Sequence, residues 1–371
     1  MHFERFGLER FFALHEHTVR FMLTASDPET LTINEVLALD GDLAASLARF
    51  ADLRLGYAEP RGSRPLREAI AALYGPAPTR ADDILVCAGA QEPILLFALA
   101  TLERGDEVIV QTPCYQSHLE VMRWAGATPI PCEVHEADAW TLDPDRVAAL
   151  VTPRTKALVL NTPHNPTGAT MSHEAQAALV ALADRHGLYV LADEVYRGLE
   201  LDVADRLPPW SNLYPRAVSL GALAKGWGLG GLRIGWCATR DATLLATLEA
   251  LKDYTTICSP SPSEHLAEVA LRHTDTLWTR TRARLASNIA AFEAFLARHE
   301  SLSWIRPRGG TMGFLRIADP RGATAWCTDV LAKAGVLIAP GPLFGAPDTH
   351  ARIGLGRADF TTALAALERA L

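Results

Sequence analysis

The sequence predicts an α/β protein with a large domain, whose mostly parallel sheet of the seven-stranded type is covered by helices, and a small α+β domain. Short β-rich runs alternate with helical stretches from residue 84 to residue 192, which is typical of crossover units in a parallel sheet. After a long helical stretch at 264–299, the pattern changes to β–β–α–β–β–α, which suits a small α+β lobe. A chain of 371 residues is also long for one core.

Three parts are expected along the chain. Residues 1–40 form an N-terminal segment that packs with the small domain and the binding site, residues 41–255 form the large domain, and residues 256–371 form the small domain. The N-terminal segment carries aromatic residues at helix-like spacing and a turn-like break at 24–28. Helices are predicted at 40–52 and 63–74, with a loop of helix breakers at 56–62 between them.

The large sheet is expected to contain seven strands. They are predicted at 84–87, 107–111, 128–134, 157–161, 189–192, 217–223 and 232–238, with helices at 92–102, 115–125, 144–151, 173–186 and 241–254. No helix separates the last two strands, so one of them is expected to run antiparallel. The small domain is predicted to contain strands at 303–306, 313–317, 336–339 and 351–354, and helices at 323–334 and 360–370.

The composition argues against several classes of protein. A formal net charge of −8 disfavours nucleic acid or an anionic membrane as the main partner. No apolar run reaches the roughly 18 residues that a membrane span needs, and the charged start of the chain does not read as a secretory signal. The six cysteines are scattered without metal-ligand spacing, so we expect reduced thiols, a cytoplasmic location and no metal site.

Polar residues follow several predicted strands, at the edge where open α/β sheets bind ligands. Gly89, Ala90 and Gln91 lie between a strand and a helix, where free backbone N–H groups form a cup for phosphate. A plain strand–helix turn explains the same residues. Tyr115 follows the next strand, and its ring could stack on a planar cofactor or simply cover the core.

Two further strand ends carry groups that suit a cyclic cofactor. Asn165, in a loop rigid with prolines, could donate its amide to a phenolate oxygen, or the loop could be only structural. Asp193 follows an apolar run, where an unpaired carboxylate is costly, and a protonated ring nitrogen would be a suitable partner. Capping of a following helix is the alternative for Asp193. Tyr196 is near enough in sequence to reach the same ligand.

A glycine-rich stretch carries Lys225 and, eight residues later, Arg233. A desolvated lysine can bond covalently to a carbonyl compound. The glycines let the backbone approach a ligand, and Arg233 could hold a phosphate bidentately. An aldehyde that carries a phosphate satisfies both groups, and pyridoxal phosphate is such a molecule. The alternative is a surface lysine and arginine beside a flexible loop.

Seven stretches together resemble the fold-type I pyridoxal-phosphate enzymes of the class I/II aminotransferase group. They span most of the chain: GYAEPRGSRPLR (56–67), AGAQE (88–92), PCY (113–115), NTPHNPTG (161–168), ADEVY (192–196), AKGWGLGGLRIGW (224–236) and ARIGLGR (351–357). The resemblance implies that Lys225 forms the internal aldimine with pyridoxal phosphate and then moves the substrate proton. It also implies that Asp193 pairs with the pyridine nitrogen and that Tyr115 stacks on the ring.

The remaining roles also come from the resemblance. Asn165 and Tyr196 would bond the ring hydroxyl, with Asn165 also near the substrate. Gly89, Ala90, Gln91 and Arg233 would hold the phosphate. Arg352 would bind the substrate α-carboxylate. Tyr57 would reach the phosphate in a neighbouring subunit, which implies a homodimer with the active site at its interface.

One departure concerns the phosphate cup. The family commonly has Ser or Thr three residues before the lysine, whereas this chain has Ala222, and the residue before the lysine is Ala224. Either the cup has one hydroxyl fewer, or Ser219 replaces it from another position.

The expected activity is amino transfer between an L-amino acid and a 2-oxo acid. The alternative is elimination, cyclisation or replacement on a γ-substituted or guanidino amino acid in specialised metabolism. The N-terminal segment resembles enzymes that act on arginine-derived amino acids, and its Glu16 and Asp27 could pair with a guanidinium. A surface glutamate and an Asp-Pro turn are the simpler interpretation of these two residues. A catalytically silent regulator is a third hypothesis, which the presence of Lys225 disfavours.

Overall fold

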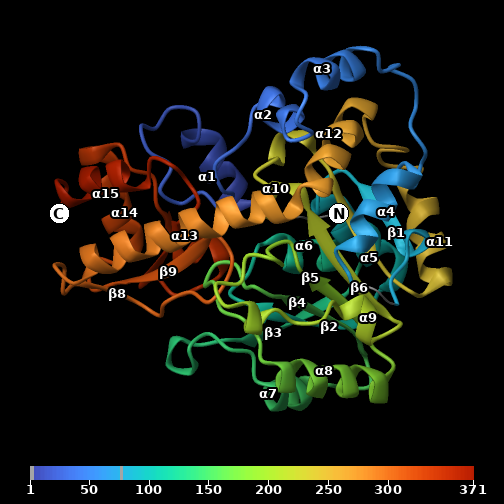
Figure 1. Cartoon of the computed structure of the whole chain (residues 1–371). Coiled ribbons are helices and arrows are strands. Elements are labelled where there is room, and N and C mark those ends of the chain that lie inside the picture. The colour runs from blue at the N-terminus through green and yellow to red at the C-terminus, as the bar shows by residue number, and fades with distance from the viewer. Residues whose placement is uncertain (1–3, 76–77) are drawn as a thin grey trace.

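The computed structural model describes residues 4–75 and 78–371, and two β-sheets organise them (Figure 1). The larger sheet has seven strands and the smaller sheet has four. Helix α13 (Thr274–Leu296), the long orange helix of Figure 1, runs between the two sheets. It contacts α10 (Leu223–Gly226) in the large domain and α15 (Phe360–Glu368) beside the smaller sheet.

The seven-stranded, mostly parallel sheet is confirmed. Its strands are β1 (Ile84–Cys87), β2 (Glu107–Thr112), β3 (Thr128–Glu133), β4 (Thr155–Asn161), β5 (Tyr189–Asp193), β6 (Ala217–Ala222) and β7 (Gly235–Ala238), in the order β1-β7-β6-β5-β4-β2-β3. Only β7 runs antiparallel, and it pairs with both β1 and β6. The carboxyl ends of the other six strands, and the start of β7, therefore lie at one edge of the sheet.

Helices cover both faces of this sheet with buried apolar side chains. The first face is packed by α5 (Gln91–Thr101), α6 (Ser117–Trp124) and α11 (Ala242–Lys252), and the second by α7 (Pro144–Leu150), α8 (His173–His186) and α9 (Trp210–Leu213). A further core lies among α2 (Ile33–Ala38), α4 (Arg64–Ala72), α12 (Ser261–Arg272) and the ends of β6 and β7. Helix α3 (Leu43–Ala51) packs beside α2.

The small sheet is antiparallel throughout. It consists of β8 (Leu302–Trp304), β9 (Met312–Ile317), β10 (Ala339–Pro340) and β11 (His350–Gly354), in the order β10-β11-β9-β8. Helices α13, α14 (Ala323–Ala334) and α15 bury a separate apolar cluster against it. The predicted α+β character of this region is confirmed.

Three predicted elements differ in the structure. The helix expected at 264–299 is two helices, because His273 adopts a non-helical conformation and its Nε2 contacts Asp40 Oδ1 at 3.0 Å. The strand expected from 232 begins only at Gly235, since a 3-10 turn precedes it and Arg233 adopts a left-handed conformation with φ 54°. In place of the strand expected at 336–339, the structure has the two-residue strand β10, which shares only Ala339 with it.

The N-terminal segment is joined to the small sheet by backbone contacts. Helix α1 (Gly7–His15) opens the described chain, Phe21 forms a parallel bridge with Val336, and the Gly354 N–H donates to Leu23 O at 3.0 Å. The Thr311 hydroxyl donates to the backbone oxygen of Ser26 at 2.6 Å. Boundaries at residues 40 and 255 stay predictions, and residues 1–3 and 76–77 lie outside the described chain.

Candidate active site

A cavity of about 190 Å³ lies at the carboxyl edge of the large sheet, between the sheet, α1 and β11. Nearly every sequence-predicted cofactor residue lines it. Its lining comprises Leu8, Glu9, Phe12, Ser26, Gly89, Ala90, Gln91, Ile94, Tyr115, Asn165, Asp193, Val195, Tyr196, Ala222, Ala224, Lys225, Arg233 and Arg352. Residues from five strand ends and from both sheets thus meet at one place.

Lys225 projects into this cavity from the short helix α10, which directly follows β6. Its Nζ donates a hydrogen bond to Ser26 Oγ at 2.9 Å and lies 5.7 Å from the centre of the Tyr196 ring. The lysine is partly buried, and no carboxylate forms an ion pair with it among the described residues. Its amine is therefore held by one hydroxyl and stays available to a ligand.

The turn between β1 and α5 faces Arg233. Gly89 has φ 71°, which favours glycine, and a Cβ at this position would lie 2.6 Å from Arg233 Nη2 and displace the guanidinium. The free N–H groups at the start of α5 and this guanidinium converge on the cavity, which suits a phosphate group. Ala222 and Ala224 line the same region without a hydroxyl.

Ser219 does not line the cavity. Its Oγ is fully buried on β6 and accepts a hydrogen bond from the Ser211 N–H at 3.0 Å. Among the described residues, the hydroxyl that the structure brings to Lys225 is Ser26, which comes from the N-terminal segment and was not expected from the sequence.

Asp193 ends β5 and is buried against a histidine. Its Oδ2 lies 3.1 Å from His118 Nε2, and its Oδ1 accepts from the Val195 N–H at 3.2 Å. A turn, not a helix, follows Asp193. His118 lies on α6, is 2% exposed, and fixes the carboxylate that faces the cavity. This arrangement suits a carboxylate that pairs with a protonated ring nitrogen.

Asn161, the last residue of β4, and Asn165, in the loop after it, make different contacts. Asn161 donates its amide to Asp193 O at 2.8 Å, and its Oδ1 accepts from the Asn165 N–H at 2.7 Å. Asn161 thus locks the ends of β4 and β5 together. Asn165 is free to line the cavity, where its Oδ1 accepts from Arg352 Nη1 at 3.0 Å.

Arg352 lies on β11 of the small sheet, and its side chain lines the cavity. It is almost completely buried, with 1% of its surface exposed. Its Nε and Nη2 donate to Thr24 O at 3.2 and 3.0 Å. Burial lowers the pKa of this guanidinium below its ordinary value. With the bond to Asn165, three hydrogen bonds orient the planar group before any ligand arrives, which suits bidentate binding of a carboxylate.

Tyr115 lies before α6 and its ring faces the cavity. The hydroxyl donates to Glu9 Oε1 at 2.8 Å, and burial, together with Glu9, raises the pKa of Tyr115 above its ordinary range. Glu9 belongs to α1 and was not among the residues predicted from the sequence. Tyr196 is 1% exposed and reaches the cavity from the turn after β5.

Three predicted binding residues lie outside the cavity in this chain. Tyr57 is 91% exposed. Glu16 is exposed and lines a separate surface groove with His17. Asp27 pairs with Arg357 at 2.8 Å. The predicted roles of Tyr57, Glu16 and Asp27 stay predictions.

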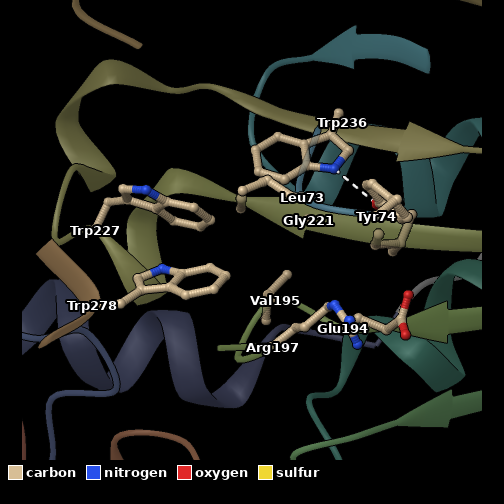
Figure 2. Close-up of a pocket in the computed structure, with 11 residues that line it drawn as sticks. Leu73, Tyr74, Glu194, Val195, Arg197, Gly221, Trp227, Trp236 and Trp278 are labelled. Atoms are coloured by element: carbon tan, nitrogen blue, oxygen red, sulfur yellow. Dashed lines mark hydrogen bonds between the residues drawn. The ribbon is translucent and has the colours of Figure 1, made fainter. Parts of the chain in front are cut away.

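A second cavity, of about 20 Å³ (Figure 2), adjoins the first, because Val195 and Ala222 line both. Figure 2 shows the rings of Trp227 and Trp278 side by side, with centroids 5.1 Å apart. Glu194 is buried there, and its Oε2 lacks a hydrogen-bond partner among the described residues. Burial raises the pKa of Glu194 to about 7, so this carboxyl binds a proton far more readily than an exposed one.

The site thus combines a lysine amine, a glycine turn and a guanidinium that suit a phosphate, a buried carboxylate and an aromatic ring at strand ends of a seven-stranded sheet. Such a site, on this fold, defines a fold-type I pyridoxal-phosphate enzyme, and the residues present fit that cofactor. The family model for aminotransferase class I and II matches residues 22–367. The chain belongs to this family, and its similarity to named aminotransferases makes it a pyridoxal-phosphate-dependent transferase.

Two relatives differ in their named activities. The chain is 31% identical over 352 residues to capreomycidine synthase of Streptomyces vinaceus, which covers 94% of this chain and 89% of that protein. It is 32% identical over 355 residues to the arginine–pyruvate transaminase AruH of Pseudomonas aeruginosa, which covers 90% of this chain and 85% of the other.

Two solved structures are similar over the whole chain. A pyridoxal-phosphate-dependent aminotransferase from Streptococcus suis superposes with a TM-score of 0.93 at 28% identity, covering 100% of this chain and 97% of that one. The pyridoxal-phosphate-dependent cyclase OrfR superposes with a TM-score of 0.89 at 30% identity, with the same coverage of 100% and 97%. Within the described residues, no helix is both long enough and apolar enough to cross a bilayer.

Proposed function

We propose that the protein transfers the amino group of an L-amino acid to a 2-oxo acid, with pyridoxal phosphate bound at Lys225. The observation that carries this proposal is the meeting of Lys225, Asp193 and Arg352 in one cavity. These residues supply an amine, a buried carboxylate and a carboxylate-binding guanidinium. Bound pyridoxal phosphate supplies an electron sink for the electron pair left at the amino-acid Cα.

The cofactor would be held by groups that the chain positions in advance. Arg233 and the N–H groups at Gly89, Ala90 and Gln91 would bind its phosphate. Asp193, fixed by His118, would keep a proton on the ring nitrogen. Tyr115 would pack against the ring, and Asn165 and Tyr196 would bond its hydroxyl.

The substrate would be oriented by Arg352 and acted on by Lys225. Because three hydrogen bonds already fix the Arg352 guanidinium, the α-carboxylate would bind in one orientation and place the Cα over the lysine. Lys225 Nζ would take the Cα proton and return it, with Ser26 Oγ holding the amine in place. The N-terminal segment, which carries Ser26 and α1, would exclude water from this proton transfer.

The test is an amino-acid screen on the holoenzyme, run with and without a 2-oxo acid acceptor such as pyruvate. Amino transfer predicts that the acceptor becomes an amino acid and that turnover stops without it. Release of ammonia or of a cyclised product without an acceptor would contradict the proposal.

The second candidate is elimination or cyclisation on a γ-substituted or guanidino amino acid. It is supported by the relatives, because capreomycidine synthase and the cyclase OrfR align with 94% and 100% of this chain. The same residues would bind the cofactor and remove the Cα proton, so they do not separate the two candidates. Mass spectrometry of the products formed without an acceptor distinguishes the two candidate activities.

We also propose a homodimer. Tyr57 and Tyr254 are each 91% exposed, and burying such rings on a second subunit would be favourable. Tyr57 would then reach the phosphate bound in the other subunit. Sedimentation of the holoenzyme tests this proposal, because a monomer would contradict it. A cytoplasmic location stays a prediction, supported by six cysteines that are all free thiols.

A further inference from the structure

Five charged side chains line the large cavity among the residues that the structure describes: Glu9, Asp193, Lys225, Arg233 and Arg352. The proposed function gives a partner to four of them. Lys225 binds the cofactor aldehyde, Arg233 its phosphate, Asp193 its ring nitrogen, and Arg352 the substrate α-carboxylate. Glu9 is left: its carboxylate is half-buried and lines the cavity, the charge of Arg352 acts on it without an ion pair between the two side chains, and no other described cation pairs with it.

Glu9 is held in position by the docking of α1. The Gly7 N–H donates to Gln116 Oε1 at 2.8 Å, and Gln116 Nε2 donates to Arg5 O at 3.0 Å. The rings of Phe6 and Tyr115 lie with centroids 5.0 Å apart. These contacts fasten both the start of α1 and the Glu9 carboxylate to the turn before α6.

The bond from Tyr115 uses only part of the Glu9 carboxylate. Oε1 accepts the Tyr115 hydroxyl at 2.8 Å, and Oε2 has no protein partner within residues 4–75 and 78–371. A carboxylate accepts about four hydrogen bonds. Leu8 and Phe12, on either side of Glu9 along α1, line the cavity with apolar surface. An aliphatic stem that ends in a hydrogen-bond-donating cation would fit this combination.

We propose that Glu9 binds the cationic end of the substrate side chain, so that the site takes a basic amino acid with a guanidinium group. This inference rests on the proposed function, in which Arg352 and Lys225 fix the α-carboxylate and the Cα. The side chain then extends toward α1. A planar guanidinium can meet a carboxylate with two parallel hydrogen bonds. An acidic side chain would meet a like charge at Glu9, and no cation is left within the described cavity to receive it.

The test compares L-arginine with L-citrulline, which has nearly the same shape but no charge. Each is titrated into the holoenzyme, and the change in the visible absorbance of the bound cofactor gives the Kd without any need for turnover. The variant Glu9→Gln keeps an oxygen that can accept from Tyr115 but removes the charge. We expect it to raise the Kd for arginine about 10- to 100-fold, which is typical for loss of a charged hydrogen bond. The Kd for citrulline should change by less than about 3-fold, because citrulline carries no charge.

Two other variants separate this role from rival explanations. Tyr115→Phe removes the hydroxyl but keeps the Glu9 charge, and it should affect arginine and citrulline equally. If Glu9→Gln also weakens both ligands equally, Glu9 only positions Tyr115 and the inference is overturned. It is likewise overturned if Glu16→Gln, and not Glu9→Gln, removes the preference for arginine.

Failure of the proposed function gives a different result. If no amino acid changes the cofactor absorbance, the proposed function fails and this inference fails with it. If neutral and basic amino acids bind equally well to the unaltered protein and to Glu9→Gln, only the role of Glu9 is overturned.

Discussion

Replacing Arg352 by lysine tests whether substrate binding depends on a guanidinium that is oriented in advance. Arg352 is 1% exposed and donates to Thr24 O at 3.2 and 3.0 Å and to Asn165 Oδ1 at 3.0 Å. A lysine keeps the charge, but its single ammonium cannot reproduce the fork that binds a carboxylate with two hydrogen bonds.

The expected loss is that of at least one charge-assisted hydrogen bond, about 1.5–3 kcal/mol. This corresponds to a decrease of about 10- to 150-fold in kcat/KM, since about 1.4 kcal/mol is a factor of ten. Most of the decrease should be in KM, because the carboxylate is bound in the ground state as well as in the transition state.

The assay is steady-state turnover, with thermal unfolding of each variant measured to exclude unfolded protein. Arg316→Lys is a matched control, because Arg316 lies on the neighbouring strand β9, is largely exposed, and pairs with Glu136. The reasoning would be refuted if Arg352→Lys stayed within about 3-fold of the unaltered protein, since one lost charged hydrogen bond exceeds that factor. An equal loss in Arg316→Lys would refute it as well.

Four further predictions concern other groups. Lys225→Ala should abolish the adduct that mass spectrometry finds after borohydride reduction, and should lower turnover roughly 100- to 10,000-fold. His118→Phe leaves Asp193 Oδ2 without its partner at 3.1 Å and should lower kcat about 10-fold, with His118→Asn restoring part of the rate. Tyr57→Phe should raise the Kd for the cofactor about 10-fold, measured by dialysis, if its hydroxyl reaches the phosphate of a second subunit. Because the pKa of Glu194 is raised to about 7, the folded state holds a proton that the unfolded state has lost, so this carboxyl makes stability fall as the pH rises from about 4.5 to about 7. Glu194→Gln removes this dependence. In urea unfolding, the free energy of unfolding of the variant, measured relative to the unaltered protein, should therefore be up to about 3 kcal/mol higher at pH 8 than at pH 5.

Residues that follow a strand were predictable from sequence because their position is a local property. Once the alternating pattern fixes parallel strands, the residues after each strand must share one edge, whatever the order of the strands. Asn165, Asp193 and Lys225 line the cavity for this reason. Arg352 lies within the antiparallel strand β11 of the small sheet, so its place at the cavity followed only from the family resemblance. The antiparallel strand β7 also followed from a local feature, since no helix long enough for a crossover was predicted between it and the preceding strand, and the structure has only the four-residue helix α10 and a short 3-10 turn there.

The residues that sequence reasoning missed depend on how distant segments meet. Contacts of Glu9 with Tyr115, Ser26 with Lys225 and His118 with Asp193 cross 106, 199 and 75 residues. The local sequence does not indicate which turn of α1 packs against the cavity. Glu16, and not Glu9, was therefore a candidate on the sequence alone, and Glu16 lies beyond the end of α1, where its side chain is exposed.

The helix break at His273 could not be predicted from the local sequence for the same reason. A helix that is interrupted without glycine or proline carries no composition signal, because the interruption is fixed by a side chain from another part of the fold. Here that side chain is Asp40, 233 residues earlier. The side chain of Trp227 donates to the hydroxyl of Thr274, the first residue after the break, at 3.1 Å.

The bonds that join Arg352 to Thr24 also determine when the enzyme can first become active. The two residues are 328 positions apart, and a ribosome that adds about 5–20 residues per second needs roughly 15 to 70 seconds to make that length. The large sheet is complete by residue 238 and can fold during this interval. The contacts of Thr24 with the small domain form only after the last strand has been made, so a chain terminated before β11 would carry Lys225 but lack the guanidinium that we propose to orient the substrate.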